Sequence, residues 1–214
     1  MLYESMRHEL FKTVLKLYQK DLIQLNMGNV SIRVSHEHFI ITPTGVPYDE
    51  MMEDDLVVVG LDGSLVEGRR KPSSEMPMHA IVYKNMPAIK AAVHTHSVFA
   101  LAFAVAGKGI PIISTEGLAV RGPVPVAAYA CAGTEAQGIA AVEAMKGPPP
   151  VSGVLLKNHG VLAVGISLSD AYATASKIET AAKVYFLALQ IGNPDTLTDE
   201  QIKEIRDVYI SKKA

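Results

Sequence analysis

The sequence VLLKNHGVLAV, residues 154–164, contains two short apolar runs separated by the polar break Asn158-His159-Gly160. Short apolar runs on either side of such a break are typical of two neighbouring strands joined by a tight turn. Two further segments have the same form: residues 30–34 with 39–42, and residues 56–61 with 64–67 around Asp62-Gly63. Hairpin-like pairs therefore recur along the chain, which favours antiparallel strand pairing.

Between these pairs lie segments whose apolar residues recur at helical spacing. They predict helices over residues 2–25, 74–84, 98–106, 134–145, 169–190 and 199–211. Two further strands are predicted over residues 88–94 and 110–114. Because strict alternation of strand and helix is missing, we expect a mixed or mainly antiparallel sheet with helices covering its faces.

Size and charge limit the possible classes of protein. A chain of 214 residues can bury one substantial core, so we expect a single domain over residues 1–214. Its net charge of −2 argues against a general affinity for nucleic acid or an anionic membrane. Cys131 is the one cysteine and cannot form an internal disulfide, and the N-terminal sequence MLYESMRHELFK lacks the apolar run of a signal peptide. We therefore expect a cytoplasmic protein.

Three histidines form the strongest chemical signal. His94 and His96 end an apolar strand, and residues two apart on a strand point to the same side. Neutral imidazole is a favoured zinc ligand, although a solvated strand end would also accommodate such a pair. His159 adds a third imidazole in the break between two apolar runs. Since a catalytic zinc site needs three protein ligands and one open position, we predict that these histidines bind a zinc-like cation.

A second group of residues has the chemistry of an anion site. In Lys71-Pro72-Ser73-Ser74-Glu75, two hydroxyls and several amides at a helix start can bind phosphate, or simply cap the helix. Beside a metal, Glu75 would be a fourth ligand or a general base. The turns Gly28-Asn29 and Thr44-Gly45 permit close approach of a ligand to the backbone. His79 falls inside a predicted helix, where we expect a partly buried histidine without a ligand role.

These pieces occur in a fixed order along the chain, and the order carries a resemblance. The series is Gly28-Asn29-Val30-Ser31, Thr42-Pro43-Thr44-Gly45-Val46-Pro47-Tyr48, Pro72-Ser73-Ser74-Glu75, His94-Thr95-His96 and Asn158-His159-Gly160. It resembles the class II aldolase/adducin family, and most of all the L-fuculose-1-phosphate aldolases, over about residues 8–190. The resemblance implies a three-layer α/β/α fold with a central, mainly antiparallel sheet and a class II aldolase-like domain.

The resemblance also implies the site and the assembly. His94, His96 and His159 would bind one Zn²⁺ per subunit, with Glu75 as the metal-adjacent acid/base. The substrate phosphate would be held by Gly28, Asn29, Thr44, Gly45, Ser73 and Ser74. The family is usually a homotetramer with active sites between subunits. The implied reaction cleaves a (deoxy)ketose 1-phosphate, such as L-fuculose 1-phosphate, to dihydroxyacetone phosphate and an aldehyde through a metal-stabilised enediolate.

The sequence departs from the fuculose aldolases at the second acid/base group. Where they carry a His-Tyr pair after an Ile-Pro strand, this chain has Ser114-Thr115-Glu116-Gly117. Glu116 falls where related epimerases and dehydratases place an acidic group, and a plain loop carboxylate is the alternative. Tyr209 corresponds to a catalytic tyrosine of the C-terminal tail, displaced by one helical turn.

Other reactions on the same fold remain open. A sugar-phosphate dehydratase or decarboxylase would use the same zinc with Glu116 as acid/base. A pentulose-phosphate 4-epimerase would break and remake the same bond without releasing product. Adducin-like members are interaction modules that have lost the metal histidines, and this chain retains all three.

Overall fold

The computed structural model describes residues 2–147 and 150–211; for residues 116, 118, 119 and 209–211 it describes the backbone alone. Within this part of the chain the helices are α1 Glu4–Gln19, α2 Met76–Asn85, α3 Val98–Ala106, α4 Glu135–Met145, α5 Leu168–Ile191 and α6 Asp199–Ser211. Short 3-10 helices lie at Glu53–Asp55 (η1) and Thr115–Val120 (η2). Among the described residues, no helix combines the length and apolar character that crossing a bilayer requires.

The strands form one sheet in the order β4-β3-β2-β1-β5-β8-β7-β6. Their bounds are β1 Asn29–Arg33, β2 His38–Ile41, β3 Val57–Gly60, β4 Leu65–Glu67, β5 Ala91–Thr95, β6 Val126–Ala127, β7 Gly153–Leu156 and β8 Gly160–Gly165. Neighbouring strands are antiparallel apart from β6 and β7, which are parallel. The predicted mainly antiparallel sheet is therefore confirmed, with one parallel pair at its edge.

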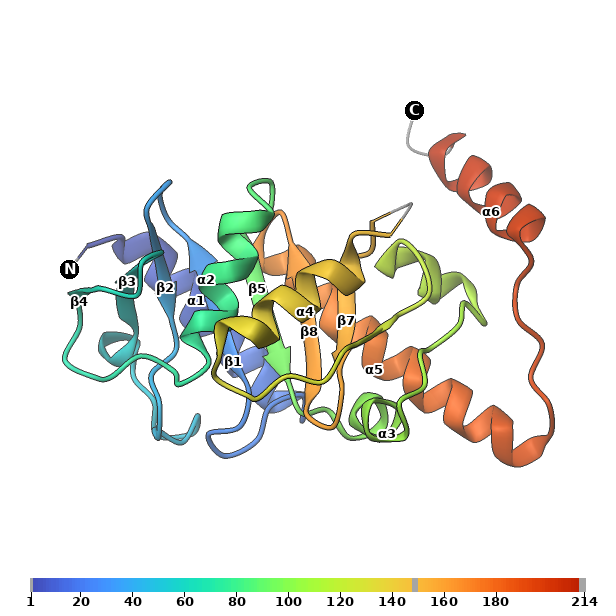
Figure 1. Ribbon diagram of the computed structural model, residues 1–214, viewed down its shortest axis with the longest axis horizontal. Helices are drawn as coiled ribbons and strands as arrows, with labels where there is room; N and C mark the ends of the chain where they lie inside the picture. Colours follow the sequence, from blue (N-terminus) through green and yellow to red (C-terminus); the bar gives the residue numbers. More distant parts are fainter. Residues whose placement is uncertain (1, 148–149, 212–214) are drawn as a thin grey trace.

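Helices cover both faces of the sheet, which gives three layers (Figure 1). Successive strand residues alternate between two apolar clusters, as Ala92 and Val93 of β5 illustrate. The cluster that contains Val93 includes residues of α1, α3 and α5. The cluster that contains Ala92 includes residues of α2 and α4. Helix α6 lies apart from the sheet at one end of the molecule (Figure 1).

Two predicted elements differ from the structure. The strand predicted over residues 110–114 is wrong: Ile110 makes an isolated bridge to Val124, and Pro111 next to it has no N–H to donate. The helix predicted over residues 2–25 ends at Gln19, because Asp21 turns the chain with a φ of 56°. Leu22 and Ile23 nevertheless remain buried, which explains why the apolar pattern continues beyond the helix.

Strand register brings the chemically distinctive residues to one end of the sheet. Asn29 at the start of β1 pairs with His94 near the end of β5. On the other side of β5, Thr95 pairs with Val161 just after the β7–β8 turn. Since β1, β5 and β8 are adjacent central strands, segments far apart in the sequence meet there.

Candidate metal centre and substrate pocket

His94 and His96 project from the end of β5 toward the β7–β8 turn. His94 is fully buried, and its Nδ1 lies 2.8 Å from the carbonyl oxygen of Val161. Because a carbonyl only accepts hydrogen bonds, Nδ1 carries the hydrogen of the neutral ring, and Nε2 keeps a free lone pair. That Nε2 lies 3.0 Å from His96 Nε2. The two rings therefore converge through the atoms that can bind a metal.

His159 reaches the same point from the tight turn between β7 and β8. Asn158 adopts a left-handed φ of 59°, which asparagine tolerates better than most residues, and this conformation places His159 at the turn. Its Nε2 lies 3.1 Å from His94 Nε2. Gly160 allows this approach, because a Cβ there would lie 2.5 Å from the Thr95 carbonyl oxygen and 3.0 Å from His94 Cε1.

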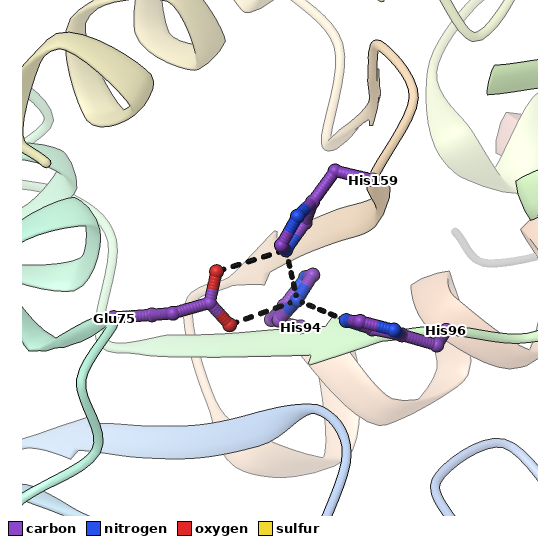
Figure 2. A group of neighbouring side chains, drawn as sticks. All are labelled: Glu75, His94, His96 and His159. Atoms are coloured by element: carbon purple, nitrogen blue, oxygen red, sulfur yellow. Dashed lines mark hydrogen bonds and ion pairs between the residues drawn. The ribbon is translucent and has the colours of Figure 1, made fainter. Parts of the chain in front are cut away.

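Glu75 completes the cluster from the residue that precedes α2 (Figure 2). Its Oε2 lies 3.0 Å from His94 Nε2, and its Oε1 lies 2.9 Å from His159 Nε2. One ligand atom from each of the four residues lies within 4.8 Å of every other. The three histidines and the carboxylate that the sequence singled out are thus brought together at one point.

The protonation of this cluster suits a divalent cation. Burial, with further contributions from His94 and His159, lowers the pKa of His96 to about 4. Burial alone would raise the pKa of the Glu75 carboxyl, but His94 and His159 hold it well below its usual range. Oε1 of Glu75 is buried and receives no hydrogen bond of ordinary geometry from the described residues. Converging lone pairs with an ionised carboxylate are the ligand set that zinc-like ions take, so the residues fit a metal.

A pocket of about 280 Å³ opens beside the cluster. Its lining residues, apart from Glu75, His96 and His159, are Asn26, Met27, Gly28, Asn29, Pro43, Thr44, Ser73, Ser74, Ala132 and Gly133. The lining contains no lysine or arginine among the described residues. An anion in this pocket would therefore be held by hydroxyls, backbone amides and the N-terminus of α2 rather than by a basic side chain.

Most residues predicted to hold a phosphate line this pocket. Ser74 and Thr44 are exposed there, whereas Ser73 is buried and its hydroxyl accepts a hydrogen bond from the Glu75 amide. This contact supports the backbone just before α2, but no side chain of the described residues caps the helix, whose N-cap residue is Glu75. Gly45, with a φ of 73°, follows Thr44 in the same turn and is not among the lining residues.

Asn29 lines the pocket, but its side chain is already engaged. Its Nδ2 donates to Glu75 Oε2 at 2.7 Å, and its Oδ1 lies 2.6 Å from His79 Nε2. Only 3% of the residue is exposed. The side chain therefore supports Glu75 rather than standing free for a phosphate.

Glu116 and Tyr209 are not placed as side chains. Glu116 belongs to η2 and Tyr209 to α6, and both side chains lie outside the described part of the chain. Their acid/base roles stay predictions. The backbone places α6 near η2, where Arg206 donates to the carbonyl of Arg121.

Two contributors were missed by sequence reasoning. The segment Ala132-Gly133 forms part of the pocket wall, and a Cβ on Gly133 would lie 3.0 Å from the Ser74 carbonyl oxygen. The glycine just before a helix start was its one sequence signal. His79 is fully buried, not partly buried, and contacts Asn29. Its separation of four residues from Glu75 on a helix was the available signal.

Comparisons with known proteins agree with this geometry. A family model described as class II aldolase and adducin N-terminal domain matches residues 8–186. The chain is 35% identical over 207 residues to a 5-deoxy-D-ribulose 1-phosphate aldolase of Bacillus thuringiensis serovar kurstaki, covering 96% of this chain and 95% of the relative. It is 44% identical over 124 residues to a probable L-ribulose-5-phosphate 4-epimerase of Mycoplasma pneumoniae, covering 56% and 51% respectively. A solved structure of an L-fuculose 1-phosphate aldolase has a TM-score of 0.88 and 35% identity, with 95% of both chains covered.

Proposed function

The chain belongs to the class II aldolase and adducin N-terminal domain family, and on that premise we propose that it is a zinc-dependent aldolase of deoxyketose 1-phosphates. The reaction would release dihydroxyacetone phosphate and an aldehyde. One observation carries the proposal: four converging ligand atoms border a pocket built from hydroxyls, amides and a helix start. The names of two similar proteins, which act on 5-deoxyribulose 1-phosphate and fuculose 1-phosphate, support this substrate class.

The arrangement of the site suggests a role for each metal-binding residue. His94, His96 and His159 would hold the ion together with Glu75, and we expect about one zinc per chain. The bound ion supplies Lewis-acid chemistry, which lowers the energy of negative charge developing on a substrate oxygen.

Glu75 is the acid/base candidate for the carbon that becomes nucleophilic. It is ionised, it is held by Asn29, and it borders the pocket. Gly28, Thr44, Ser73 and Ser74, which line that pocket, would hold the phosphate, with Gly45 next to Thr44 in the same turn. A second proton-transfer group at the aldehyde half is still required, and Glu116 and Tyr209 are the candidates.

The proposal is tested with zinc-loaded protein and a panel of ketose 1-phosphates that includes 5-deoxyribulose 1-phosphate and fuculose 1-phosphate. Dihydroxyacetone phosphate is followed through its reduction by NADH and glycerol-3-phosphate dehydrogenase. Release with at least one substrate is the expected result. His94→Ala should abolish it, whereas His36→Ala, which removes an exposed histidine, is the matched control.

A second candidate function is pentulose-phosphate 4-epimerisation, which the partial likeness to a probable epimerase favours. The two are separated by product. Inversion at C-4 of a pentulose 5-phosphate without release of dihydroxyacetone phosphate from any ketose 1-phosphate would replace the aldolase proposal. An enol or decarboxylated product would instead indicate the dehydratase or decarboxylase reaction.

We also propose that the chain assembles as a homotetramer. Apolar side chains of the C-terminal half of α5 are exposed in the single chain: Val184, Phe186, Leu187, Leu189 and Ile191. Several large exposed apolar side chains on one helix are typical of a protein interface. Light scattering of the purified protein measures the oligomer directly, and a monomer at micromolar concentration would contradict the proposal.

A further inference from the structure

A series of buried, hydrogen-bonded side chains, here called the relay, leads away from Glu75. It runs between two facing stripes: Asn29 and Ser31 on β1, and Glu75 just before α2 with His79 and Tyr83 along that helix. Residues two apart on a strand share a face, as do residues four apart on a helix, so the stripes meet along their length. The contacts are Glu75 Oε2–Asn29 Nδ2 at 2.7 Å, Asn29 Oδ1–His79 Nε2 at 2.6 Å, His79 Nδ1–Ser31 Oγ at 2.6 Å and Ser31 Oγ–Tyr83 OH at 2.7 Å.

The chemistry of Glu75 fixes the direction of every hydrogen bond in this chain. An ionised carboxylate only accepts, so Asn29 must present its amide NH₂ group to it, and its Oδ1 faces His79. That oxygen also only accepts, so the hydrogen of His79 must lie on Nε2. Nδ1 of the neutral ring then accepts from the Ser31 hydroxyl, which in turn accepts from Tyr83. All four bonds donate toward Glu75.

His79 is held in one form by this arrangement. The residue is fully buried, and burial lowers the pKa of its ring to about 3, so the ring is neutral at neutral pH. The other neutral tautomer would set the lone pair of Nε2 against that of Asn29 Oδ1. A protonated ring would donate from Nδ1 and reverse the Ser31 contact.

We propose that His79 and Asn29 are positioning residues that hold Glu75 for proton transfer, with Asn29 selecting the His79 tautomer and Ser31 donating to its Nδ1. The inference rests on the proposed function, in which Glu75 takes a proton from carbon. Asn29 holds Oε2 by donating a hydrogen bond to it, and Oε1 remains on the side that faces His159. Groups that orient a metal-site residue in this way typically contribute about 10- to 100-fold to activity.

The test measures proton removal without an aldehyde. Zinc-loaded protein is incubated with dihydroxyacetone phosphate in D₂O, and loss of the C–H signal is followed by proton NMR. His79→Leu should slow the exchange roughly 10- to 100-fold, with zinc content and affinity for dihydroxyacetone phosphate unchanged. His79→Gln should restore the rate to within a few-fold, because its amide N–H can replace Nε2–H as the donor to Asn29.

Tyr83→Phe is the matched control at the far end of the chain. It removes a buried hydroxyl, as the relay variants remove polar groups, but it leaves the Ser31 donor in place. A smaller effect than that of His79→Leu is expected. If His79→Leu does not fold, Ser31→Ala tests the same relay, since it removes the hydrogen bond that supports the His79 ring at Nδ1 and should also slow exchange.

A second readout does not depend on activity. In ¹⁵N-histidine spectra of the zinc-loaded protein, His79 should show a protonated Nε2 and an unprotonated Nδ1 throughout the neutral pH range. An Nδ1–H tautomer, or wild-type exchange rates in folded His79→Leu, would overturn the relay. If wild-type protein shows no exchange, the proposed function fails, and the tautomer still decides whether the relay exists.

Discussion

Replacing His79 by glutamine should remove the contribution of this buried ring to the acid sensitivity of folding. The pKa of this ring is about 3 in the folded protein against an ordinary value of 6.5. Between these values the unfolded chain binds a proton that the folded chain does not, so stability falls as pH falls. The slope approaches about 1.4 kcal/mol per pH unit below pH 6.5. From pH 6.5 to about 4.5 the free energy of unfolding falls by about 2 kcal/mol from this source. Glutamine does not titrate, so the variant lacks this loss.

Urea unfolding of chelator-treated protein at a fixed concentration measures this difference across the same pH range. Wild-type stability should decline by about 2 kcal/mol more than that of His79→Gln. The residues of the metal cluster are present in both proteins, so the comparison isolates the substitution at position 79. His36→Gln, which removes an exposed imidazole, should give a curve parallel to wild type. Parallel curves for wild type and His79→Gln would refute the reasoning.

Further predictions concern the metal cluster itself. His94→Ala should lose zinc and turnover together, because its Nε2 faces all three other ligand residues; elemental analysis with kinetics checks this. Glu75→Gln should lower kcat at least about 100-fold while retaining more zinc than activity, and equal loss of both would make Glu75 chiefly a ligand. Gly160→Ala should cost about 1–3 kcal/mol of folding stability in urea unfolding and weaken zinc binding, because its Cβ would lie 2.5 Å from a backbone oxygen. Gly192→Ala, with nothing within 4 Å of the added Cβ, is its control.

The metal ligands could be predicted because their signals are local. His94 and His96 are two residues apart at the end of an apolar run, and His159 stands in a visible hairpin turn. A polar residue repeated on one strand side, or placed in a short turn, reveals its position without knowledge of the fold. The central sheet was predictable for the same reason, since its hairpins carry their own turn residues.

The relay and part of the pocket could not be predicted, because they depend on contacts between distant segments. His79 and Asn29 are fifty residues apart, and nothing near either one indicates that α2 packs across β1. Residues 110–114 have the composition of a strand, but Pro111 cannot donate, and the carbonyl of Ile112 accepts from Leu197 of the C-terminal segment instead. Local pattern cannot anticipate a partner that lies at the other end of the chain.

The sheet order also determines when each neighbour of β5 becomes available during synthesis. β5 lies between β1, made long before it, and β8, made some seventy residues later. While the ribosome synthesises the intervening chain, one apolar edge of β5 has no strand beside it, and such edges promote aggregation. The nascent protein is therefore prone to aggregate until residues 160–165 have emerged from the ribosomal tunnel.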